Sequence, residues 1–218
     1  MKRRLLGLVL GIAAALSLTG AAFAATLVDD GFASLDSSVW RTWNASDNGK
    51  VAASGGVLEF SGVDGGWKQT GLMLKKPVDL TKGAVSIEVD YKSLGFTQQP
   101  VGLWNNGTVD GEDTWNYAGF RLTVGPTSIH PEITPPCDCS FNSTDADPQI
   151  SAPAAVVWTI TPKAGTVYDT TIAVNGQNQY TGTLDIGSLD AKAMYVYLYV
   201  SNNDGTGPTD ITHVKITQ

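Results

Sequence analysis

The sequence predicts an all-β protein folded as a two-sheet antiparallel β-sandwich, and three observations support this fold class. Runs of β-branched and aromatic residues recur about every 8–15 residues, with turn residues between them. Glycine is abundant, with 24 copies, while charged residues make up only 16% of the chain. No long segment shows the periodicity of an amphipathic helix. A series of strands without helices favours a sandwich over a propeller or a βαβ fold.

The first 24 residues have the three parts of a secretory signal peptide. The basic start is Lys2-Arg3-Arg4, an apolar stretch runs from Leu5 to Leu18, and Ala22-Phe23-Ala24 is a small-x-small cleavage signature. The apolar stretch is short and interrupted by glycines, which argues against a membrane anchor. We therefore expect cleavage after Ala24 and a single mature domain over residues 25–218. This domain would work in the periplasm or outside the cell.

The mature chain is acidic. Three of the 14 basic residues lie in the leader, which leaves 11 against 21 acidic residues and a net charge of −10. Such a chain offers no basic surface to nucleic acid or to anionic lipid. No segment after the leader is long and apolar enough to span a membrane. We therefore expect neither nucleic-acid binding nor a membrane span, and the oligomeric state stays open.

The expected strands of the first half are short and bounded by Gly, Asp and Ser. The clearest alternation lies in 84–92, where Val, Ile and Tyr occupy one face and Ser, Glu and Asp the other. A helical turn is expected over 34–39. The expected strands are 26–32, 40–44, 50–53, 56–61, 67–74, 84–92, 101–104 and 115–124.

The second half carries the strongest local signals. Asn175-Gly176 is a preferred two-residue turn and predicts a hairpin of strands 167–174 and 177–184. The near-continuous apolar run within 193–201 predicts a strand that is covered on both faces. Further strands are expected over 155–161 and 211–217.

Residues 125–154 interrupt this series. Their high proline content excludes central strands, so an irregular loop is expected here. Such a loop is either functional or a variable surface insertion. It contains Cys137 and Cys139, the only cysteines, for which we favour a local disulfide in an oxidising compartment. A metal site with His130 is the alternative, but the spacing matches no usual zinc motif.

Several motifs resemble, in order, those of concanavalin A-like lectin/glucanase domains. The opening Val28-Asp29-Asp30-Gly31-Phe32, followed by a Leu35-Asp36 to Trp40 turn, is similar to the D-D-F strand and L-D-x-x-x-W turn of that family. The pieces that follow in the family's order are Gly56–Phe60, Gly83–Asp90, Tyr168–Gly176, Tyr197–Ser201 and Asp210–Ile216. The resemblance spans nearly the whole mature chain and implies a jelly-roll sandwich. It implies either an enzyme or a binding module, because the family contains both.

The catalytic strand of the glucanase branch, E-x-D-x-E or E-x-D-x-x-E, is incomplete in this chain. Glu88 and Asp90 match its first two acids, but the acid/base position holds Lys92 or Ser93. Retaining hydrolysis requires two carboxyl groups about 5–5.5 Å apart. We therefore interpret Glu88 and Asp90 as the polar face of a strand and expect no catalytic residue. If the chain were a hydrolase, the acids available to it would be Glu88, Asp90, Glu112 and Asp113.

A polysaccharide lyase would need a Tyr or His base beside Arg or Gln. Arg121, Tyr117 and His130 are the candidates, but their spacing resembles no lyase motif. The other histidine, His213, lies in the closing strand, where we expect a plain sheet-face residue.

Aromatic residues beside Asn and Asp predict a sugar-binding surface near the middle of the chain. Sugar rings stack on exposed aromatic rings, while amides and carboxylates bind the hydroxyl groups. The expected contacts are Trp104, Asn105, Trp115, Asn116, Tyr117 and Trp67. The alternative is that these rings fill the core, as we expect for Trp40 and Trp158.

No cofactor is expected to be required, although a structural Ca²⁺ is compatible with the sequence. The family resemblance implies such an ion where the first and last strands meet, and Asp29, Asp30 and Asp210 would supply the oxygen ligands there. Turn acids in 110–113 and 202–205 are alternatives, and solvated acids without an ion are the simplest interpretation.

These observations favour a secreted, lectin-like domain that binds an extracellular glycan or polysaccharide without cleaving it. The alternatives are a glycoside hydrolase or polysaccharide lyase with a divergent site, or a structural surface protein without a small ligand.

Overall fold

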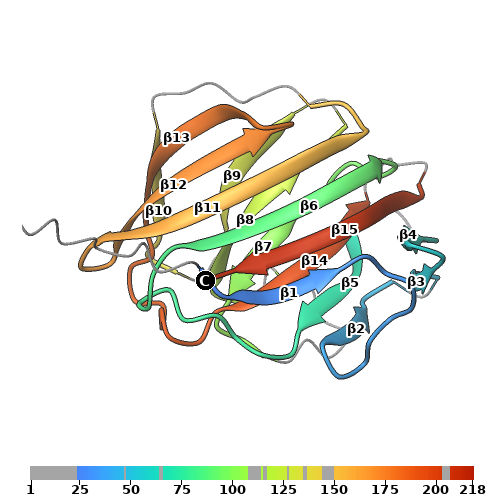
Figure 1. Ribbon diagram of the computed structural model, residues 1–218, viewed down its shortest axis with the longest axis horizontal. Coiled ribbons are helices and arrows are strands. Elements are labelled where there is room, and N and C mark those ends of the chain that lie inside the picture. The colour runs from blue at the N-terminus through green and yellow to red at the C-terminus, as the bar shows by residue number, and fades with distance from the viewer. Residues whose placement is uncertain are drawn as a thin grey trace, which may run out of the picture.

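A computed structural model describes residues 24–46, 48–63, 66–107, 114, 117–126, 128–134, 137–143, 150–202 and 207–218. The predicted leader over residues 1–23 lies outside the described residues. The regular structure consists of two antiparallel β-sheets stacked face to face (Figure 1), which confirms the predicted sandwich. Within the described part of the chain, no helix has the length and apolarity needed to cross a membrane.

The larger sheet has nine strands in the order β10-β13-β12-β11-β6-β15-β4-β3, with β1 added beside β15. Its strands are β1 (Thr26–Asp30), β3 (Lys50–Ser54), β4 (Val57–Ser61), β6 (Val85–Ser93), β10 (Ser140–Ser143), β11 (Ala154–Ala164), β12 (Val167–Val174), β13 (Gln177–Asp185) and β15 (Thr209–Thr217). The predicted hairpin of β12 and β13 turns at Asn175-Gly176, where both residues have positive φ, as this kind of turn requires.

The smaller sheet has six strands in the order β2-β5-β14-β7-β8-β9. Its strands are β2 (Trp40–Asn44), β5 (Lys68–Leu74), β7 (Val101–Trp104), β8 (Gly119–Val124), β9 (Ile129–Thr134) and β14 (Tyr195–Asn202). The strand β14 lies in the middle of this sheet and is buried on both faces, as its apolar run predicts.

The hydrophobic core lies between the two sheets. Phe120 of β8 meets Trp158 of β11 edge to face, with ring centres 5.8 Å apart, so side chains from the two layers interdigitate. Trp40 and Trp158 are both 1% exposed, as expected for core residues. Their indole N–H groups donate to Asp30 and to Thr170, respectively, at 2.8 Å, which satisfies them inside the core.

The segment 125–154 is less irregular than expected. It contains β9 and β10, and these two strands lie at the edges of their sheets. Pro131 sits within β9, where an edge strand tolerates the missing N–H. The proline content therefore excluded central strands, as argued from the sequence, but it did not exclude edge strands.

Candidate functional site

A second side-chain layer covers the outer face of the smaller sheet, away from the sandwich core. The strand register aligns Glu132, Arg121, Gly102, Tyr197 and Met73 in one row across β9, β8, β7, β14 and β5. Alternation along each strand points these side chains to the same face. The sandwich core lies on the opposite face of the sheet, so these side chains are not needed to fill it. This outer face is therefore a candidate site.

One part of this face is an aromatic cluster. It consists of Trp43, Met73, Trp104, Tyr197 and Tyr199. The Trp104 ring packs edge to face on Tyr197, with centres 4.9 Å apart, and lies 5.7 Å from Tyr199. It fills the space above Gly102, where any Cβ would overlap the ring. All five side chains are buried. This part of the face therefore presents no exposed aromatic ring on which a ligand could stack.

The other part is a charged network around Arg121, whose side chain is 1% exposed. Its Nε donates to the Glu132 carboxylate at 2.6 Å, and its Nη1 donates to the Tyr199 hydroxyl at 2.7 Å. Glu132 also accepts a hydrogen bond from Thr123 at 2.6 Å and contacts the His130 ring at 3.0 Å. The buried guanidinium is thus compensated by a carboxylate that itself has three partners, as a buried charge requires.

These contacts set the protonation of Glu132. Burial favours the neutral acid, but the hydrogen bond from His130 and the charge of Arg121 outweigh it and lower the pKa of Glu132 to about 2. The carboxylate is therefore ionised over the whole physiological range. Such a group holds a cation or a sugar hydroxyl well, but it is a poor proton donor.

This pKa makes a prediction about acid stability. Because the pKa of Glu132 is lower in the folded state than its ordinary 4.5, its ionisation stabilises the fold above about pH 4.5. That contribution, about 2–3 kcal/mol, is lost as the pH falls from about 4.5 to 2. Urea unfolding at neutral pH and near pH 3 should show this loss in the wild type and a smaller one in Glu132→Gln. Equal losses in both proteins would contradict the assignment.

A hollow of about 370 Å³ opens beside this network, lined by Trp67, Gln98, Arg121 and Glu132. Trp67 is 41% exposed and is one of two large hydrophobic residues exposed in the described part of the chain. It has a positive φ of 64°, in a turn that leads into β5. The hollow therefore combines an open indole with an amide, a guanidinium and a carboxylate, which are the groups that recognise sugars.

The row next to the hollow contains a second amide, Gln69. Ser201 of β14 pairs with Gln69 of β5 on one side and with Gln98 on the other. Gln69 therefore lies in the same row as Gln98, which lines the hollow. Gln69 is fully buried, and its carbonyl accepts a hydrogen bond from the Thr114 N–H at 2.9 Å. Its Nε2 has no hydrogen-bond partner among the described residues. A buried donor of this kind is commonly satisfied by a water or a ligand.

The structure separates the expected sugar contacts. Trp67 lines the hollow, whereas Trp104 is fully buried and cannot be the open platform that the sequence suggested, because its ring occupies the space beside Gly102. Asn105 braces a turn, donating to the carbonyl groups of Asp190 and Ala193. Tyr117 is partly buried against the aromatic cluster. The remaining contacts and acids, Trp115, Asn116, Glu112 and Asp113, lie outside the described residues.

Sequence reasoning missed Gln98 and Glu132, and it dismissed Arg121 and His130 on spacing. The signal that could have found them is the polar side chains at alternate positions of Gly119–Val124 and Ile129–Thr134, two short runs whose other positions hold mostly apolar residues.

Glu88 and Asp90, the other acids considered for catalysis, lie on the outer face of the larger sheet. They point the same way from one strand, β6, and are half-buried. A retaining glycosidase needs carboxyl groups on either side of the scissile bond. The third acid of the glucanase motif is missing from this strand, where Lys92 or Ser93 stands in its place.

The expected calcium ligands do not meet. In the β1/β15 pairing Asp29 lies opposite Lys215 and Asp30 opposite Val214, which leaves Asp210 four residues further along the strand. Asp30 accepts hydrogen bonds from the Phe32 N–H and the Trp40 indole, both at 2.8 Å. Asp210 pairs with Lys92 at 3.2 Å. The expected calcium site of Asp29, Asp30 and Asp210 is therefore not formed, because the strand register keeps Asp210 away from the other two carboxylates.

The sulfur atoms of Cys137 and Cys139 are adjacent, between β9 and β10. They pack against the sandwich core at the point where the chain crosses from one sheet to the other. This location connects the two edge strands, and neither cysteine is among the residues that line the hollow.

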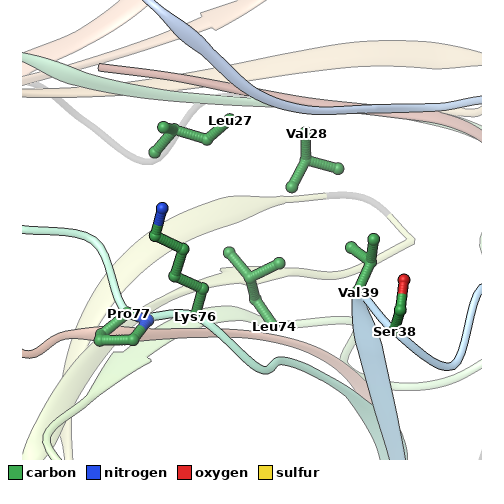
Figure 2. A pocket seen from close by; sticks show the side chains of 7 residues that line it. All are labelled: Leu27, Val28, Ser38, Val39, Leu74, Lys76 and Pro77. Atoms are coloured by element: carbon green, nitrogen blue, oxygen red, sulfur yellow. The ribbon is translucent and has the colours of Figure 1, made fainter.

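A second hollow, of about 200 Å³, lies between β1 of the larger sheet and the end of β5 in the smaller sheet (Figure 2). Its lining is mostly apolar and consists of Leu27, Val28, Ser38, Val39, Leu74, Lys76 and Pro77. It has no amide or carboxylate side chain to bind sugar hydroxyl groups, so the hollow at Trp67 is the better candidate site.

No family model matches the chain, and no curated protein matches it in sequence. Solved structures do match in fold. The carbohydrate recognition domain of Emp46p is 13% identical with a TM-score of 0.58, covering 88% of this chain and 94% of that one. The exoplasmic/lumenal domain of VIP36, in a Ca²⁺- and Man2-bound form, is 12% identical with a TM-score of 0.54, covering 86% and 85%.

An endo-1,3-β-glucanase from Streptomyces sioyaensis is 10% identical with a TM-score of 0.52, and the match covers 89% of this chain and 96% of that one. Identities this low show a shared fold alone. Lectin domains and a glucanase thus share the same two-sheet architecture with this protein. The chain has the jelly-roll fold of the concanavalin A-like lectins and glucanases.

Proposed function

We propose that this protein binds a glycan or polysaccharide, without cleaving it, in the hollow on the outer face of the smaller sheet. A sugar ring stacks on Trp67, and its hydroxyl groups bind Gln98 and Glu132, which the buried Arg121 holds in position. The observation that carries the proposal is the pairing of an indole that is 41% exposed with three polar side chains around one hollow. The structural neighbours with carbohydrate recognition domains support it.

The test is the loss of glycan binding in Trp67→Ala. Binding partners are first found on a glycan array and by pull-down with insoluble polysaccharides, and affinity is then measured by calorimetry. We expect Trp67→Ala to weaken binding about tenfold or more, which corresponds to about 1.4 kcal/mol. Stability should change little because the ring is exposed.

Leu27→Ala is the matched control. Leu27 is 40% exposed, almost the same as Trp67, but lies at the other hollow. It should leave glycan affinity unchanged. An equal loss in both variants, or binding that survives Trp67→Ala, would rule out the stacking role of Trp67.

Glu132 is the one carboxylate among the described residues that line the hollow, which supports binding over hydrolysis. Reducing-sugar release from the polysaccharides that bind should stay at the background level. Sustained release that is lost in Glu132→Gln would favour a hydrolase instead.

A polysaccharide lyase is the second candidate, and one observation favours it. The fold places the Tyr199 hydroxyl, Arg121 and the His130–Glu132 pair in one network beside the hollow, which their spacing in the sequence did not suggest. Burial raises the pKa of Tyr199, however, and makes its hydroxyl a weaker acid and a less accessible base at neutral pH. A lyase cleaves a uronate polymer by elimination and leaves an unsaturated sugar. An increase in ultraviolet absorbance when the protein is incubated with uronate polymers would therefore support the lyase.

The setting of this function is also part of the proposal. Residues 1–24 direct export and are removed after Ala24, Cys137 and Cys139 form a disulfide, and the mature domain meets its glycan outside the cytoplasm. The exoplasmic/lumenal location of the VIP36 domain supports this setting. Mass spectrometry of the exported protein gives both the new N-terminus and the mass change on reduction.

A Ca²⁺ ion remains part of the proposal because the VIP36 neighbour is Ca²⁺-bound. Turn acids in 110–113, outside the described residues, offer hard oxygen ligands for it. Glycan affinity measured in EDTA and in excess Ca²⁺ tests this role.

A further inference from the structure

The outer face of the larger sheet carries a cluster of metal-ligating side chains on the adjacent strands β6 and β15 (Figure 1). One ligand atom from each of Glu88, Asp90 and His213 lies within 4.8 Å of the other two. The two acids alternate along β6, which points both to the outer face. The cluster and the hollow at Trp67 therefore lie on different sheets.

A β-bulge brings His213 into this cluster. Ile211 pairs with Tyr91 and His213 pairs with Asp90, so β15 uses two residues where β6 uses one. Thr212 is the extra residue, and His213 turns to the outer face instead of the core. Bulges commonly redirect a side chain in this way.

Hydrogen bonding orients the His213 ring. Its Nε2 lies 2.8 Å from the Asp29 carboxylate, and its Nδ1 lies 3.6 Å from the Asp90 carboxylate. Asp29 can only accept, so Nε2 carries the proton of this hydrogen bond and the ring presents Nδ1 to Asp90. A carboxylate that holds the far nitrogen of a histidine is the usual support of a metal ligand.

Asp90 has one carboxylate oxygen that no described side chain or backbone group satisfies. Oδ1 of Asp90 is buried and has no hydrogen-bond partner among the described residues. Lys215 lies opposite Glu88 in the register, and Lys92 lines the hollow beside Asp90 but pairs with Asp210, so these lysines are the competing positive charges. An open hollow beside Asp90, lined also by Tyr91, Thr212 and Asn175, leaves room for a further ligand.

We propose that Glu88, Asp90 and His213 bind a divalent transition-metal ion of the Zn²⁺ type, with Asp29 as the residue that positions the histidine. One imidazole nitrogen, two carboxylate oxygens and a water make the four-coordinate set that zinc accepts. Ca²⁺ is disfavoured because it takes six to eight oxygen ligands. The site is independent of the glycan hollow.

Calorimetric titration of the metal-free full mature domain with ZnCl₂ tests the proposal. We expect one Zn²⁺ per chain with micromolar affinity, lost in His213→Ala and weakened about 10-fold or more in Asp29→Asn. Asp210→Asn is the matched control, because Asp210 lies on the same strand and face but pairs with Lys92. It should bind Zn²⁺ as the wild type does.

A second readout separates lost ligands from lost folding. Co²⁺ in place of Zn²⁺ should give the visible absorption of a four-coordinate site in the wild type and in Asp210→Asn. Unfolding curves of His213→Ala should show a folded domain. Absence of Zn²⁺ binding in the wild type, or binding that survives His213→Ala, overturns the proposal. A ring that titrates against Asp29 and Asp90 without binding metal would show a plain ion pair and would also overturn it.

Discussion

Replacing Glu132 by Gln should destabilise the fold by about 3–5 kcal/mol, because it leaves the buried Arg121 guanidinium without its counter-charge. Arg121 is 1% exposed and makes two contacts to this carboxylate, at 2.6 Å through Nε and 2.5 Å through Nη2. Two further acceptors of Arg121, the Tyr199 hydroxyl and the side-chain amide oxygen of Gln98, carry no charge. Urea unfolding of the wild type and the variant at neutral pH measures the loss.

The double variant Arg121→Met/Glu132→Gln sharpens this test. Removing the guanidinium as well removes the uncompensated charge, so the double variant should be more stable than Glu132→Gln alone. Arg121→Met by itself should cost less than Glu132→Gln, since Glu132 is 26% exposed and keeps Thr123 and His130. Additive losses in the cycle would show that the two residues do not act as a pair.

Replacing Trp104 by Ala should also destabilise the fold by about 3–5 kcal/mol, the usual cost of emptying the space of a buried large aromatic side chain. The ring is fully buried between Tyr197, Tyr199 and the backbone of Gly102 and Gly119. Thermal or urea unfolding measures the effect.

Trp104→Phe is the companion variant. It keeps an aromatic ring and removes an indole N–H that has no hydrogen-bond partner among the described residues. It should therefore lose much less stability than Trp104→Ala and should retain glycan binding. A stable Trp104→Ala protein with lost glycan binding would instead return Trp104 to the role of a sugar platform.

Most of the fold could be predicted from the pattern of apolar and polar residues along the strands. Alternation in Val85–Tyr91, the Asn175-Gly176 turn and the apolar run of β14 each depend on local chemistry and are confirmed. The apolar run of β14 also indicated the aromatic cluster on the outer face. Tyr197 and Tyr199 alternate with Val196 and Leu198, so the tyrosines share one face of the strand. Nothing local distinguished this outer layer from the core, so Trp104 was expected to be an open platform although it is buried.

The site depended on contacts between residues distant along the chain. Arg121 and Glu132 lie in neighbouring strands, whereas Tyr199 reaches them across 78 residues from Arg121. Spacing along the chain cannot reveal such a network, because sheet order and register decide which side chains meet. Sheet order and register also separate Asp210 from Asp29 and bring His213 beside Glu88 and Asp90.

The sequence by itself determined the class of fold, the acidic net charge, the hairpin at Asn175-Gly176 and the strand covered on both sides, because each follows from local periodicity and composition. The tertiary structure alone decided which polar residues share a face, which of the described tryptophans stays open and which metal-ligating side chains lie together. Those outcomes depend on strand order, and a one-residue bulge such as the one beside His213 is enough to change them.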